Sequence, residues 1–269
     1  MEIKDKNISA DKIQQKVKFS VIMPCYKGEG FIENSIKTIE KEISLFERDF
    51  EVIVVIDGFI DNGYEKAKAL EQEYYNLKVV GYEINRGKGH AIIYGLKHCQ
   101  GEYVAFLDSD LDYHPQALAW FLKIIKEKDA DLVTGNRRDK NSTFKYPLIR
   151  KLASWWFNIY VNFLFPELKI DDTQAGIKLI RRNCAQELFH HLEDQEGAHG
   201  FIYDIYLLVL ARKLDLKILQ APCIFTMKSS TIGMRQKFFK SAYNMGKEVW
   251  KFKHNFYEKF FCKKSFHNG

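Results

Sequence analysis

The chain has 269 residues and a net charge of +6, and 46% of its residues are hydrophobic while 28% are charged, a composition typical of a globular protein with a sizeable core. No apolar run approaches the roughly 18 residues of a membrane-spanning helix, and the first sixteen residues lack the apolar centre of a signal peptide. The five cysteines are scattered, with no Cys-x-x-Cys pair, which argues against zinc or a disulfide framework and predicts a cytoplasmic location.

Strands and helices alternate through the first half of the chain. Short apolar runs bounded by turn residues predict strands, and apolar residues three or four apart predict helices. Strands that alternate with helices of this length predict a mostly parallel sheet flanked by helices, an α/β fold. The expected strands are Val17–Met23 (stopped by Pro24), Glu51–Asp57, Leu77–Tyr82, Tyr103–Asp108 and Asp131–Gly135, and the expected helices are Phe31–Phe46, a segment ending near Tyr75, Gly87–Cys99 and Pro115–Lys126.

The second half is less regular. The segment Pro147–Phe165 is rich in Trp and Phe, Phe201–Lys213 predicts a helix, and Lys217–Met227 predicts a strand interrupted by Pro222. We find no internal repeat or linker. The sequence therefore predicts a lead-in over residues 1–16, a single domain over residues 17–230 and a tail over residues 231–269.

The tail carries the excess of positive charge. From Thr231 onward there are nine Lys/Arg and two Asp/Glu, whereas the first 230 residues hold 32 basic and 33 acidic side chains. The tail is also rich in Phe, Tyr and Trp, so we expect an amphipathic helical segment suited to an anionic membrane surface. The alternative is a helix docked on the core with a Lys-rich outer face. No recognition motif suggests nucleic acid as a partner.

The stretch Tyr103–Asp112 is an apolar strand that ends in carboxylates. Asp108 and Asp110 are two residues apart, and such side chains point the same way in an extended chain. Clustered carboxylates repel one another unless a cation lies between them, and Mg²⁺ or Mn²⁺ would suit such oxygen ligands and the phosphates of a substrate. The alternative is a solvated acidic turn, in which Asp is common.

Three polar groups follow predicted strands: Asp57, Asp108 and the pair Asn136-Arg137. In open parallel sheets, ligands bind at the carboxyl ends of the strands, near the point where the strand order reverses. We therefore expect these residues to meet at one edge of the sheet, which favours a functional site over an acidic turn.

Six short motifs occur in order along the chain: Val21–Tyr26 (VIMPCY), Val54–Gly58 (VVIDG), Asn85–Gly89 (NRGKG), Phe106–Leu111 (FLDSDL), Thr134–Arg137 (TGNR) and Asp172–Lys178 (DTQAGIK). Together they resemble the family 2 glycosyltransferases, which have the GT-A fold, a Rossmann-like arrangement. The last motif narrows the resemblance to the branch of the dolichyl- and polyprenyl-phosphate sugar synthases. The resemblance extends from about Phe19 to Thr231.

The resemblance implies a donor site for a UDP- or GDP-linked sugar, with Asp57 hydrogen-bonded to the base and Arg86 or Lys88 beside the nucleotide. It also implies a divalent cation, Mg²⁺ or Mn²⁺, on the donor diphosphate. The metal ligands would be Asp108, Asp110 and, as a helper, Asp112. The nucleotide-sugar contacts would be Pro24, Tyr26, Glu29, Asp57, Arg86, Lys88, Asp108 and Asp110.

For the acceptor, the resemblance implies a lipid phosphate that attacks the anomeric carbon, so that the configuration inverts. Permanent charge and bidentate geometry suit arginine to this contact. Lys88 and Lys178 could equally be surface lysines, and Arg150 could be a snorkelling residue. The acceptor-phosphate residues would be Arg137, Arg150, Ser154 and Lys178, and the catalytic residues would be Asp110, Arg137 and Arg150.

The chain departs from the family pattern at three places. Lys27-Gly28 replaces the usual Asn-Glu of the first loop, Asp112 replaces a common Gln, and Tyr203–Tyr206 (YDIY) lacks the final Glu of Phe-Asp-x-Glu. An acceptor phosphate is already an anion near neutral pH, since its second pKa is about 6. It therefore needs no carboxylate base, and the loss of that Glu is compatible with a lipid-phosphate acceptor.

The aromatic stretch Trp155–Phe165 lies close to Arg150 in the sequence, and it predicts either a core helix or a membrane-facing surface shared with the tail. In the second case the protein would be peripheral on the cytoplasmic face of a membrane.

The rival functions are a family 2 enzyme acting on a glycan or protein hydroxyl with Asp204 as base, a non-catalytic binding module, and a nucleotidyltransferase. The intact Asp108/Asp110 pair argues against the second rival. The first loop, with one Lys and no Arg, argues against the third.

Overall fold

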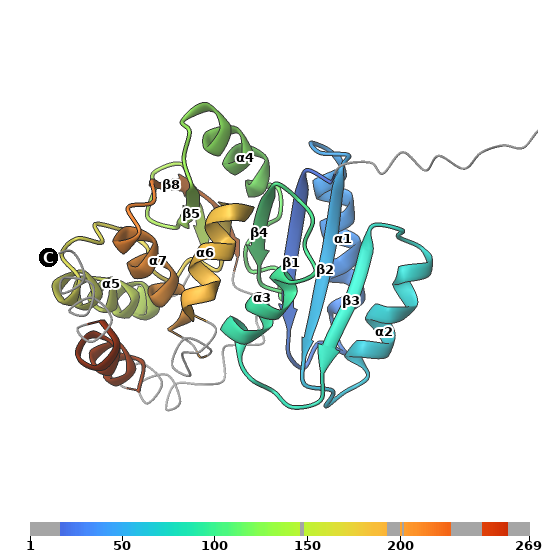
Figure 1. Ribbon diagram of the computed structural model, residues 1–269, viewed down its shortest axis with the longest axis horizontal. Coiled ribbons are helices and arrows are strands. Elements are labelled where there is room, and N and C mark those ends of the chain that lie inside the picture. Colours follow the sequence, from blue (N-terminus) through green and yellow to red (C-terminus); the bar gives the residue numbers. More distant parts are fainter. Residues whose placement is uncertain (1–16, 146–147, 193–199, 201, 227–243, 258–269) are drawn as a thin grey trace, which may run out of the picture.

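A seven-stranded sheet forms the centre of the protein (Figure 1). The computed structural model describes residues 17–145, 148–192, 200, 202–226 and 244–257. The strand order is β3-β2-β1-β4-β7-β5-β8, and all neighbours are parallel except β7, which is antiparallel to β4 and to β5. The expected mostly parallel α/β sheet is confirmed. The strands are β1 (Phe19–Cys25), β2 (Phe50–Asp57), β3 (Leu77–Tyr82), β4 (Tyr103–Leu107), β5 (Leu132–Asn136), β7 (Ile177–Arg181) and β8 (Ile218–Pro222).

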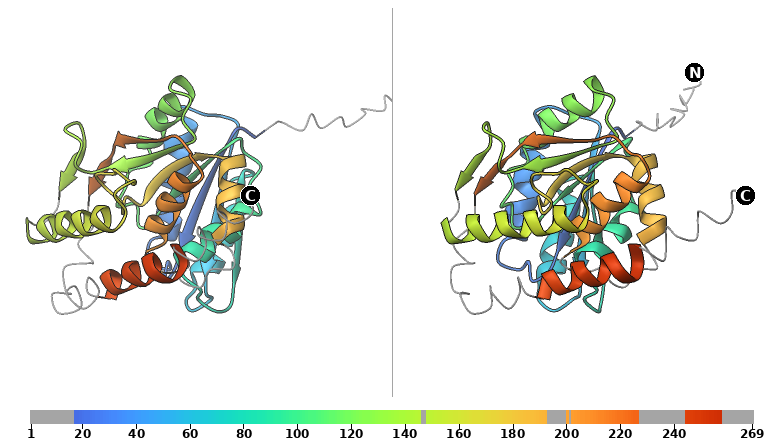
Figure 2. Two further views of the ribbon diagram at one scale, coloured as in Figure 1. Left: turned by 60° about the vertical axis from the view of Figure 1, so that its left-hand side comes forward. Right: turned by 90° about the vertical axis from the view of Figure 1, so that its left-hand side faces the viewer.

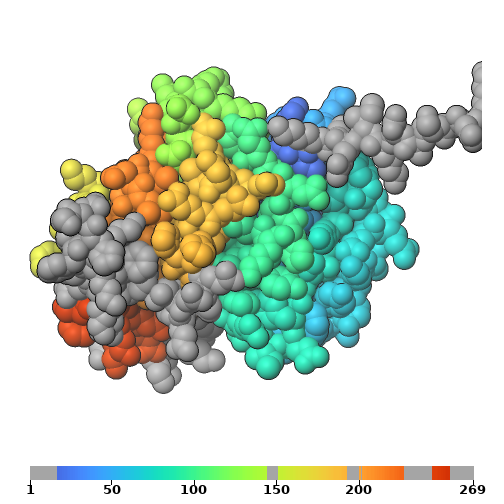
Figure 3. All heavy atoms as spheres, viewed as in Figure 1, coloured from blue at the N-terminus to red at the C-terminus, as the bar shows by residue number. Residues whose placement is uncertain are grey.

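Helices cover both faces of the sheet, because successive side chains of its buried strands point to opposite faces. In β1, for example, Val21 and Met23 join one apolar cluster and Ile22 joins the other. The first face is covered by α1 (Ile32–Ser44), α2 (Gly63–Ala69) and α4 (Ala117–Glu127), and the second by α3 (Lys88–Leu96), α5 (Leu148–Leu164), α6 (Arg182–Leu192) and α7 (Tyr203–Lys213). On the second face, α3 and α6 form a continuous surface (Figure 3).

The helix α7 is enclosed by the rest of the protein. Its residues from Tyr203 to Ala211 are all buried. Asp204 is the only acidic residue in this segment and is 9% exposed. A buried carboxylate needs positive partners, and these partners lie at the candidate site described below.

Each expected element in the described residues is present, with three differences, whereas α6 and β7 had no expected counterpart. First, β1 continues through Pro24 to Cys25, because β4 pairs with β1 only as far as Ile22 and a missing N–H is tolerated where a strand has one neighbour. Second, the expected helix ending near Tyr75 is shorter and closes with the 3₁₀ turn η1 (Leu70–Gln72). Third, the last expected strand divides into β8 and β9 (Ile224–Thr226), and β9 pairs with β6 (Thr143–Lys145).

One part of the basic tail is described, and it docks on the core. Residues 244–251 form an α-helix that continues into the π-helical turn η4 (Phe252–Tyr257), and this C-terminal helix lies beside α5 (Figure 2). Val249 and Phe252 are buried, and Phe252 stacks on Tyr206 of α7, whereas Trp250 is 51% exposed. The predicted lead-in and the rest of the tail lie outside the described residues. No helix in the described part of the chain is both long and apolar enough to cross a bilayer.

A buried carboxylate lies on α1, away from the candidate site. Glu40 is 6% exposed; its Oε2 accepts a hydrogen bond from Asn76 Nδ2 (3.0 Å), and its Oε1 has no hydrogen-bond partner in the described part of the chain. Burial raises the pKa of Glu40 to about 6, and the Asn76 bond opposes this only in part. Because the folded-state pKa is higher than the unfolded one, the contribution of Glu40 to stability falls as pH rises from about 4.5 to 6.

Replacement of Glu40 by Met should therefore stabilise the protein above pH 6.5. We expect Glu40→Met to raise the free energy of unfolding at pH 7.5 by up to about 2 kcal/mol, since one pKa unit corresponds to about 1.4 kcal/mol. The gain should shrink towards pH 4.5, where the native carboxyl group is neutral. Urea denaturation at pH 4.5, 6 and 7.5 measures it, and equal gains at all three pH values would contradict the prediction.

Candidate active site

The strand order reverses between β1 and β4, and the loops that follow these strands leave the sheet at its carboxyl edge. In open α/β sheets this is the position of the ligand crevice. Asp57 is the last residue of β2 and Asp108 directly follows β4. Both carboxylates therefore lie at the carboxyl ends of parallel strands, as expected, although β1 separates the two strands; that they meet Arg137 around one ligand stays a prediction.

The first loop, which follows β1, is hydrogen-bonded to the loop that follows β2. The backbone N–H of Glu29 donates to Asp61 Oδ2 (3.1 Å), and its carboxylate accepts a hydrogen bond from Asn62 Nδ2 (3.0 Å). Pro24 is buried within β1, whereas Tyr26 is 46% exposed. Glu29 thus fixes the position of the loop, and Tyr26 offers a ring surface to a ligand.

Asp57 holds the loop that contains the predicted nucleotide contacts. Its carboxylate accepts hydrogen bonds from the backbone N–H of Arg86 (2.7 Å), the backbone N–H of Gly87 (2.9 Å) and Asn85 Nδ2 (2.8 Å). Gly87 has a φ of 95°, a conformation that suits glycine. The side chain of Asp57 is therefore committed to ordering this loop at the entrance of α3.

Asp108 is fixed from two sides. Its Oδ1 lies 2.8 Å from Lys88 Nζ, at the first residue of α3. Its Oδ2 lies against Gly176, where a Cβ atom would come within 2.1 Å of the oxygen. Any side chain at position 176 would displace the carboxylate, so the glycine of the loop before β7 is a steric requirement of Asp108.

The acidic loop offers two carboxylates of different exposure. The Asp108 side chain is 31% exposed, and Asp110 is exposed, with its Oδ1 accepting the backbone N–H of Asp112 (3.1 Å). Among the described residues, no three acidic, histidine or cysteine side chains form a metal cluster by themselves. Two oxygen ligands nevertheless fit Mg²⁺ or Mn²⁺, which usually complete their shell with substrate phosphates and water.

Four charged side chains of alternating sign run inward from Asp108. Lys88 Nζ also lies 3.4 Å from Asp204 Oδ2, and Asp204 Oδ1 lies 2.5 Å from Lys178 Nζ. Burial would raise the pKa of Asp204, but the two ammonium groups outweigh it and hold that pKa below its usual value. Burial lowers the pKa of Lys178, which is 1% exposed and also donates to the carbonyl of Ala175. We call these four residues the charge row.

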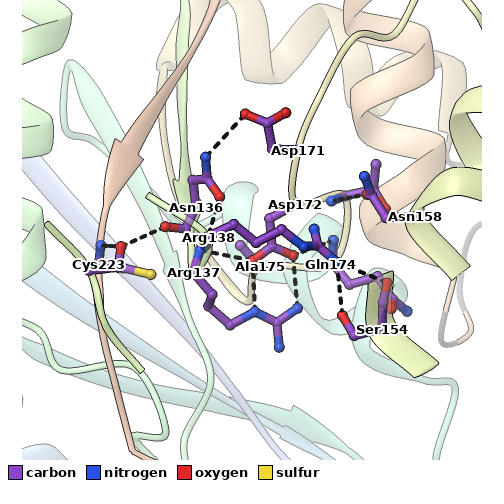
Figure 4. A network of polar contacts seen from close by, with 12 residues as sticks. Asn136, Arg137, Arg138, Ser154, Asn158, Asp171, Asp172, Gln174, Ala175 and Cys223 are labelled. Carbon is purple, nitrogen blue, oxygen red and sulfur yellow. Dashed lines mark hydrogen bonds and ion pairs between the residues drawn. The ribbon is translucent and has the colours of Figure 1, made fainter. Parts of the chain in front are cut away.

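Arg137 forms a buried bidentate ion pair with Asp172. Its Nε donates to Oδ2 (2.7 Å), one terminal nitrogen donates to Oδ1 (2.8 Å), and its backbone N–H also reaches Oδ2 (3.0 Å) (Figure 4). The side chains are 10% and 2% exposed. Burial would raise the pKa of Asp172, but Arg137 outweighs it and lowers that pKa. The pair anchors the loop of residues 171–176 to the end of β5.

The neighbouring Arg138 turns the other way, towards α5 (Figure 4). One of its terminal nitrogens donates to the carbonyl oxygen (2.9 Å) and the hydroxyl (3.3 Å) of Ser154. The other, Nη1, is buried and has no hydrogen-bond partner among the residues that the structure describes. Both arginines line a pocket of about 250 Å³, which we call the arginine pocket; its other lining residues are Lys151, Ser154, Trp155 and Asp172.

The four residues predicted to bind the acceptor phosphate have different surroundings. Ser154 lines the arginine pocket and Arg137 lines it while paired with Asp172. Lys178 lies in the core with Asp204 and the Ala175 carbonyl as partners. Arg150 belongs to α5, but its side chain lies outside the part of the structure that is described. Their phosphate contacts stay predictions.

A continuous apolar stripe lies on the outer side of α5. Its members follow the helical spacing of three or four residues, and the exposed fractions range from 40% to 78%. The opposite side of the helix is buried, with Val161 at 0% exposure. Trp155 belongs both to this stripe and to the wall of the arginine pocket. The apolar stripe consists of Leu152, Trp155, Trp156, Ile159 and Phe163.

Sequence reasoning overlooked Arg138 and did not assign roles to Asp172 and Gly176. Asp172 and Gly176 belong to the DTQAGIK motif, so the sequence marked both residues, but it did not identify Arg137 and Asp108 as the residues that they contact. Arg138 had a weaker signal, its position directly after Arg137. Two consecutive arginines do not reveal which of the two guanidinium groups forms an ion pair within the protein.

Comparison with known proteins identifies relatives of this chain. The family model described as Glycosyl transferase family 2 matches residues 20–189. A dolichyl-phosphate beta-glucosyltransferase from Dictyostelium discoideum is 26% identical over 245 residues, which cover 86% of this chain and 72% of that protein. The protein of the same name from Saccharomyces cerevisiae is 26% identical over 238 residues, covering 80% and 69%.

Solved structures share the fold. Glucosyl-3-phosphoglycerate synthase from Mycobacterium tuberculosis, in complex with UDP, superposes with a TM-score of 0.62 at 20% identity, covering 88% of this chain and 80% of that chain. TarS 1–349 from S. aureus superposes with a TM-score of 0.51 at 21% identity, covering 78% and 58%. The predicted GT-A arrangement is confirmed.

The Arg137–Asp172 pair should be a main determinant of stability. Replacement of Arg137 by Met leaves Asp172 buried without its cation, which typically costs about 3 to 5 kcal/mol. We expect Arg137→Met to lower the urea midpoint strongly. The exposed pair Lys123–Glu127 provides the control, since Lys123→Met should cost less than about 1 kcal/mol. Similar midpoints for the two variants would show that the buried pair is dispensable.

Proposed function

The chain belongs to glycosyl transferase family 2, and on that premise we propose that it transfers a hexose from a nucleoside diphosphate sugar to a polyprenyl or dolichyl phosphate, with inversion at the anomeric carbon. The relatives named dolichyl-phosphate beta-glucosyltransferase make glucose the first sugar to test. A structural neighbour was solved with Mn²⁺ and UDP-glucose, which supports UDP-glucose over GDP-mannose as the first donor.

On the donor side, Asp108 and Asp110 would hold the Mg²⁺ or Mn²⁺ ion, with Asp112 next to them. When bound, the cation would neutralise the charge that develops on the leaving nucleoside diphosphate. Lys88, 2.8 Å from Asp108, lies where it could contact the same diphosphate. Tyr26 and the loop at Arg86 would border the nucleotide, and Asp57, whose carboxylate accepts three hydrogen bonds from this loop, would act by holding it.

On the acceptor side, the nucleophile would be a phosphate oxygen. A phosphate monoester carries −1.5 to −2 charges at neutral pH, so no protein group has to remove a proton. The protein would supply position and positive charge, which are the main sources of catalysis when the nucleophile is already ionised. The arginine pocket, at the carboxyl end of β5, offers a fixed position and positive charge.

The observation that carries this proposal is the apolar stripe of α5 next to the arginine pocket. An exposed apolar surface beside a cationic pocket suits an acceptor with a charged head and a hydrocarbon chain. The exposed cations Lys151 of α5 and Lys247 and Lys251 of the C-terminal helix would add attraction to anionic lipids. The protein would therefore work as a peripheral protein on the cytoplasmic face of a membrane.

The alternative is transfer to a glycan or protein hydroxyl, with Asp204 as the general base. Asp204 is 9% exposed and contacts Lys178 and Lys88. Its pKa lies below the usual value, which makes it a poor proton acceptor. The ammonium groups of Lys88 and Lys178 would have to move away from the Asp204 carboxylate before it could accept a proton. The charge row therefore supports a phosphate acceptor, which needs no base.

A donor panel tests the proposal directly. Radiolabelled UDP-glucose, GDP-mannose and UDP-N-acetylglucosamine are incubated with polyprenyl phosphate and Mn²⁺, Mg²⁺ or EDTA, and label in the organic phase is counted. We expect label from one donor only, its loss in EDTA, and a drop of at least about 100-fold for Asp108→Asn. Transfer to water-soluble glycans with none to the lipid would reject the proposal.

The pH profile separates a phosphate nucleophile from a carboxylate base. The rate with polyprenyl phosphate should rise between pH 5 and 7, as the phosphate loses its second proton near pH 6. Asp204→Asn should lower kcat, because Lys178 loses its buried counterion, and should leave the position of this rise unchanged. Disappearance of the rise in the variant would assign it to Asp204.

Membrane binding should depend on the apolar stripe. Trp156→Ser with Phe163→Ser removes two exposed stripe residues outside the arginine pocket, and we expect the variant to float less with anionic vesicles. Leu45→Ser with Tyr75→Ser is the matched control, since both residues are exposed apolar side chains outside α5. Equal flotation of the two variants would argue against the stripe.

A further inference from the structure

We propose that Lys88 is an internal competitor for the divalent cation at Asp108. It contacts a carboxylate oxygen that the cation would use, and it releases this oxygen when a nucleoside diphosphate offers it another partner. The inference rests on the proposed function and adds to it a control of metal binding by the charge row. Tight metal binding would then depend on the nucleotide through Lys88 as well as through the phosphate oxygens themselves.

Lys88 lies between two carboxylates that come from different parts of the fold. Its Nζ is 2.8 Å from Oδ1 of Asp108, which follows β4, and 3.4 Å from Oδ2 of Asp204, near the start of α7. The shorter contact is on the side of the acidic loop, where the cation would bind. A divalent cation and an ammonium group repel each other at such distances, so they would compete for Asp108.

The inner end of the charge row is fixed independently of Lys88. Lys178 is 1% exposed; its Nζ lies 2.5 Å from Asp204 Oδ1 and also donates to the carbonyl of Ala175. Its place is set by the pairing of β7 with β4, in which Lys178 lies opposite Phe106. Asp204 therefore keeps a buried counterion when Lys88 moves away, so the movement does not leave this carboxylate buried alone.

The outer end of the row is accessible to a ligand. The side chains of Lys88 and Asp108 are 28% and 31% exposed, whereas the side chain of Asp204 is 12% exposed. Lys88 is also the first residue of α3, directly after the loop of the predicted nucleotide contacts. Its ammonium group has three donors on a flexible stem, so it can turn from a carboxylate to a phosphate oxygen without crossing the core.

The net charge of the row determines how strongly it attracts a cation. The two carboxylates and two ammonium groups are neutral together. Removal of the Lys88 charge leaves a net negative row and frees Asp108, whereas removal of the Asp204 charge leaves a net positive row and concentrates Lys88 on Asp108. The two changes should therefore shift metal affinity in opposite directions. A merely structural role of the row would not produce this opposition.

The test is Mn²⁺ binding measured by electron paramagnetic resonance, first without nucleotide and then with UDP or GDP, whichever binds more tightly. Lys88→Met should bind Mn²⁺ alone about 3- to 30-fold more tightly than the wild type, because the ammonium contact to Asp108 is lost. It should bind the nucleotide about 10-fold more weakly. Lys88→Arg, which keeps the charge, should bind Mn²⁺ alone like the wild type, and Asp204→Asn should bind it more weakly.

Lys97→Met is the matched control, because Lys97 is exposed at the other end of α3 and its loss should leave Mn²⁺ binding unchanged. Tighter Mn²⁺ binding in Lys88→Met, with a smaller effect of the nucleotide on Mn²⁺ affinity in that variant, supports the inference. Equal or weaker Mn²⁺ binding in Lys88→Met overturns it, and so does the absence of Mn²⁺ binding to every protein. Melting temperatures identify a variant that unfolds, and the two Lys88 variants decide the outcome where Asp204→Asn does.

Transfer assays report on the proposed function separately, since no acceptor or sugar is present in the binding test. Mn²⁺ binding controlled by Lys88, without transfer to polyprenyl phosphate, would reject that function and retain the inference for a metal-dependent nucleotide site. Transfer to the lipid, with the same Mn²⁺ affinity in Lys88→Met and the wild type, would retain the function and reject the inference.

Discussion

The loop of residues 171–176 contacts a charged side chain at each end and so connects the two sides of the site. At one end Asp172 neutralises Arg137, and at the other Gly176 leaves room for the carboxylate of Asp108. Buried or crowded charges are costly unless their partners are held in place. Any movement of this loop would disturb the Arg137–Asp172 ion pair at the arginine pocket and the carboxylate of Asp108 in the acidic loop. The geometry of the site therefore depends on the conformation of this segment.

The charge row extends into the core, where buried charges also need fixed partners of opposite sign. Two carboxylates and two ammonium groups alternate from Asp108 to Lys178, so that the row is neutral as a whole. Neutrality makes its burial against α7 tolerable, since each charge is next to one of opposite sign. The row also fixes Lys88 at the entrance of the site, between the carboxylates of Asp108 and Asp204.

Sequence reasoning succeeded where a local pattern determines the structure. The apolar runs that end in Asp57 and Asp108 determine both the strands and the edge at which these carboxylates emerge. It failed where the partner is distant in the chain. Nothing local reveals that Arg137 pairs with Asp172, 35 residues away, or that Lys178 lies in the core opposite Asp204. The short apolar run Ile177–Ile180 likewise gives no strand direction, which is set by neighbours on both sides.

The antiparallel direction of β7 has a consequence for how such a protein can diversify. Because β7 runs opposite to its neighbours, the segment that leads into it, and not the one that leaves it, reaches the carboxyl edge. The predicted donor contacts come from one continuous part of the chain, residues 24–112, and the arginine pocket, the proposed acceptor site, comes from the next, residues 137–172. Exchange of the second part between homologues could change the molecule that receives the sugar while the first part keeps its nucleotide. Under the proposed function, donor and acceptor specificity would thus lie in consecutive parts of the sequence.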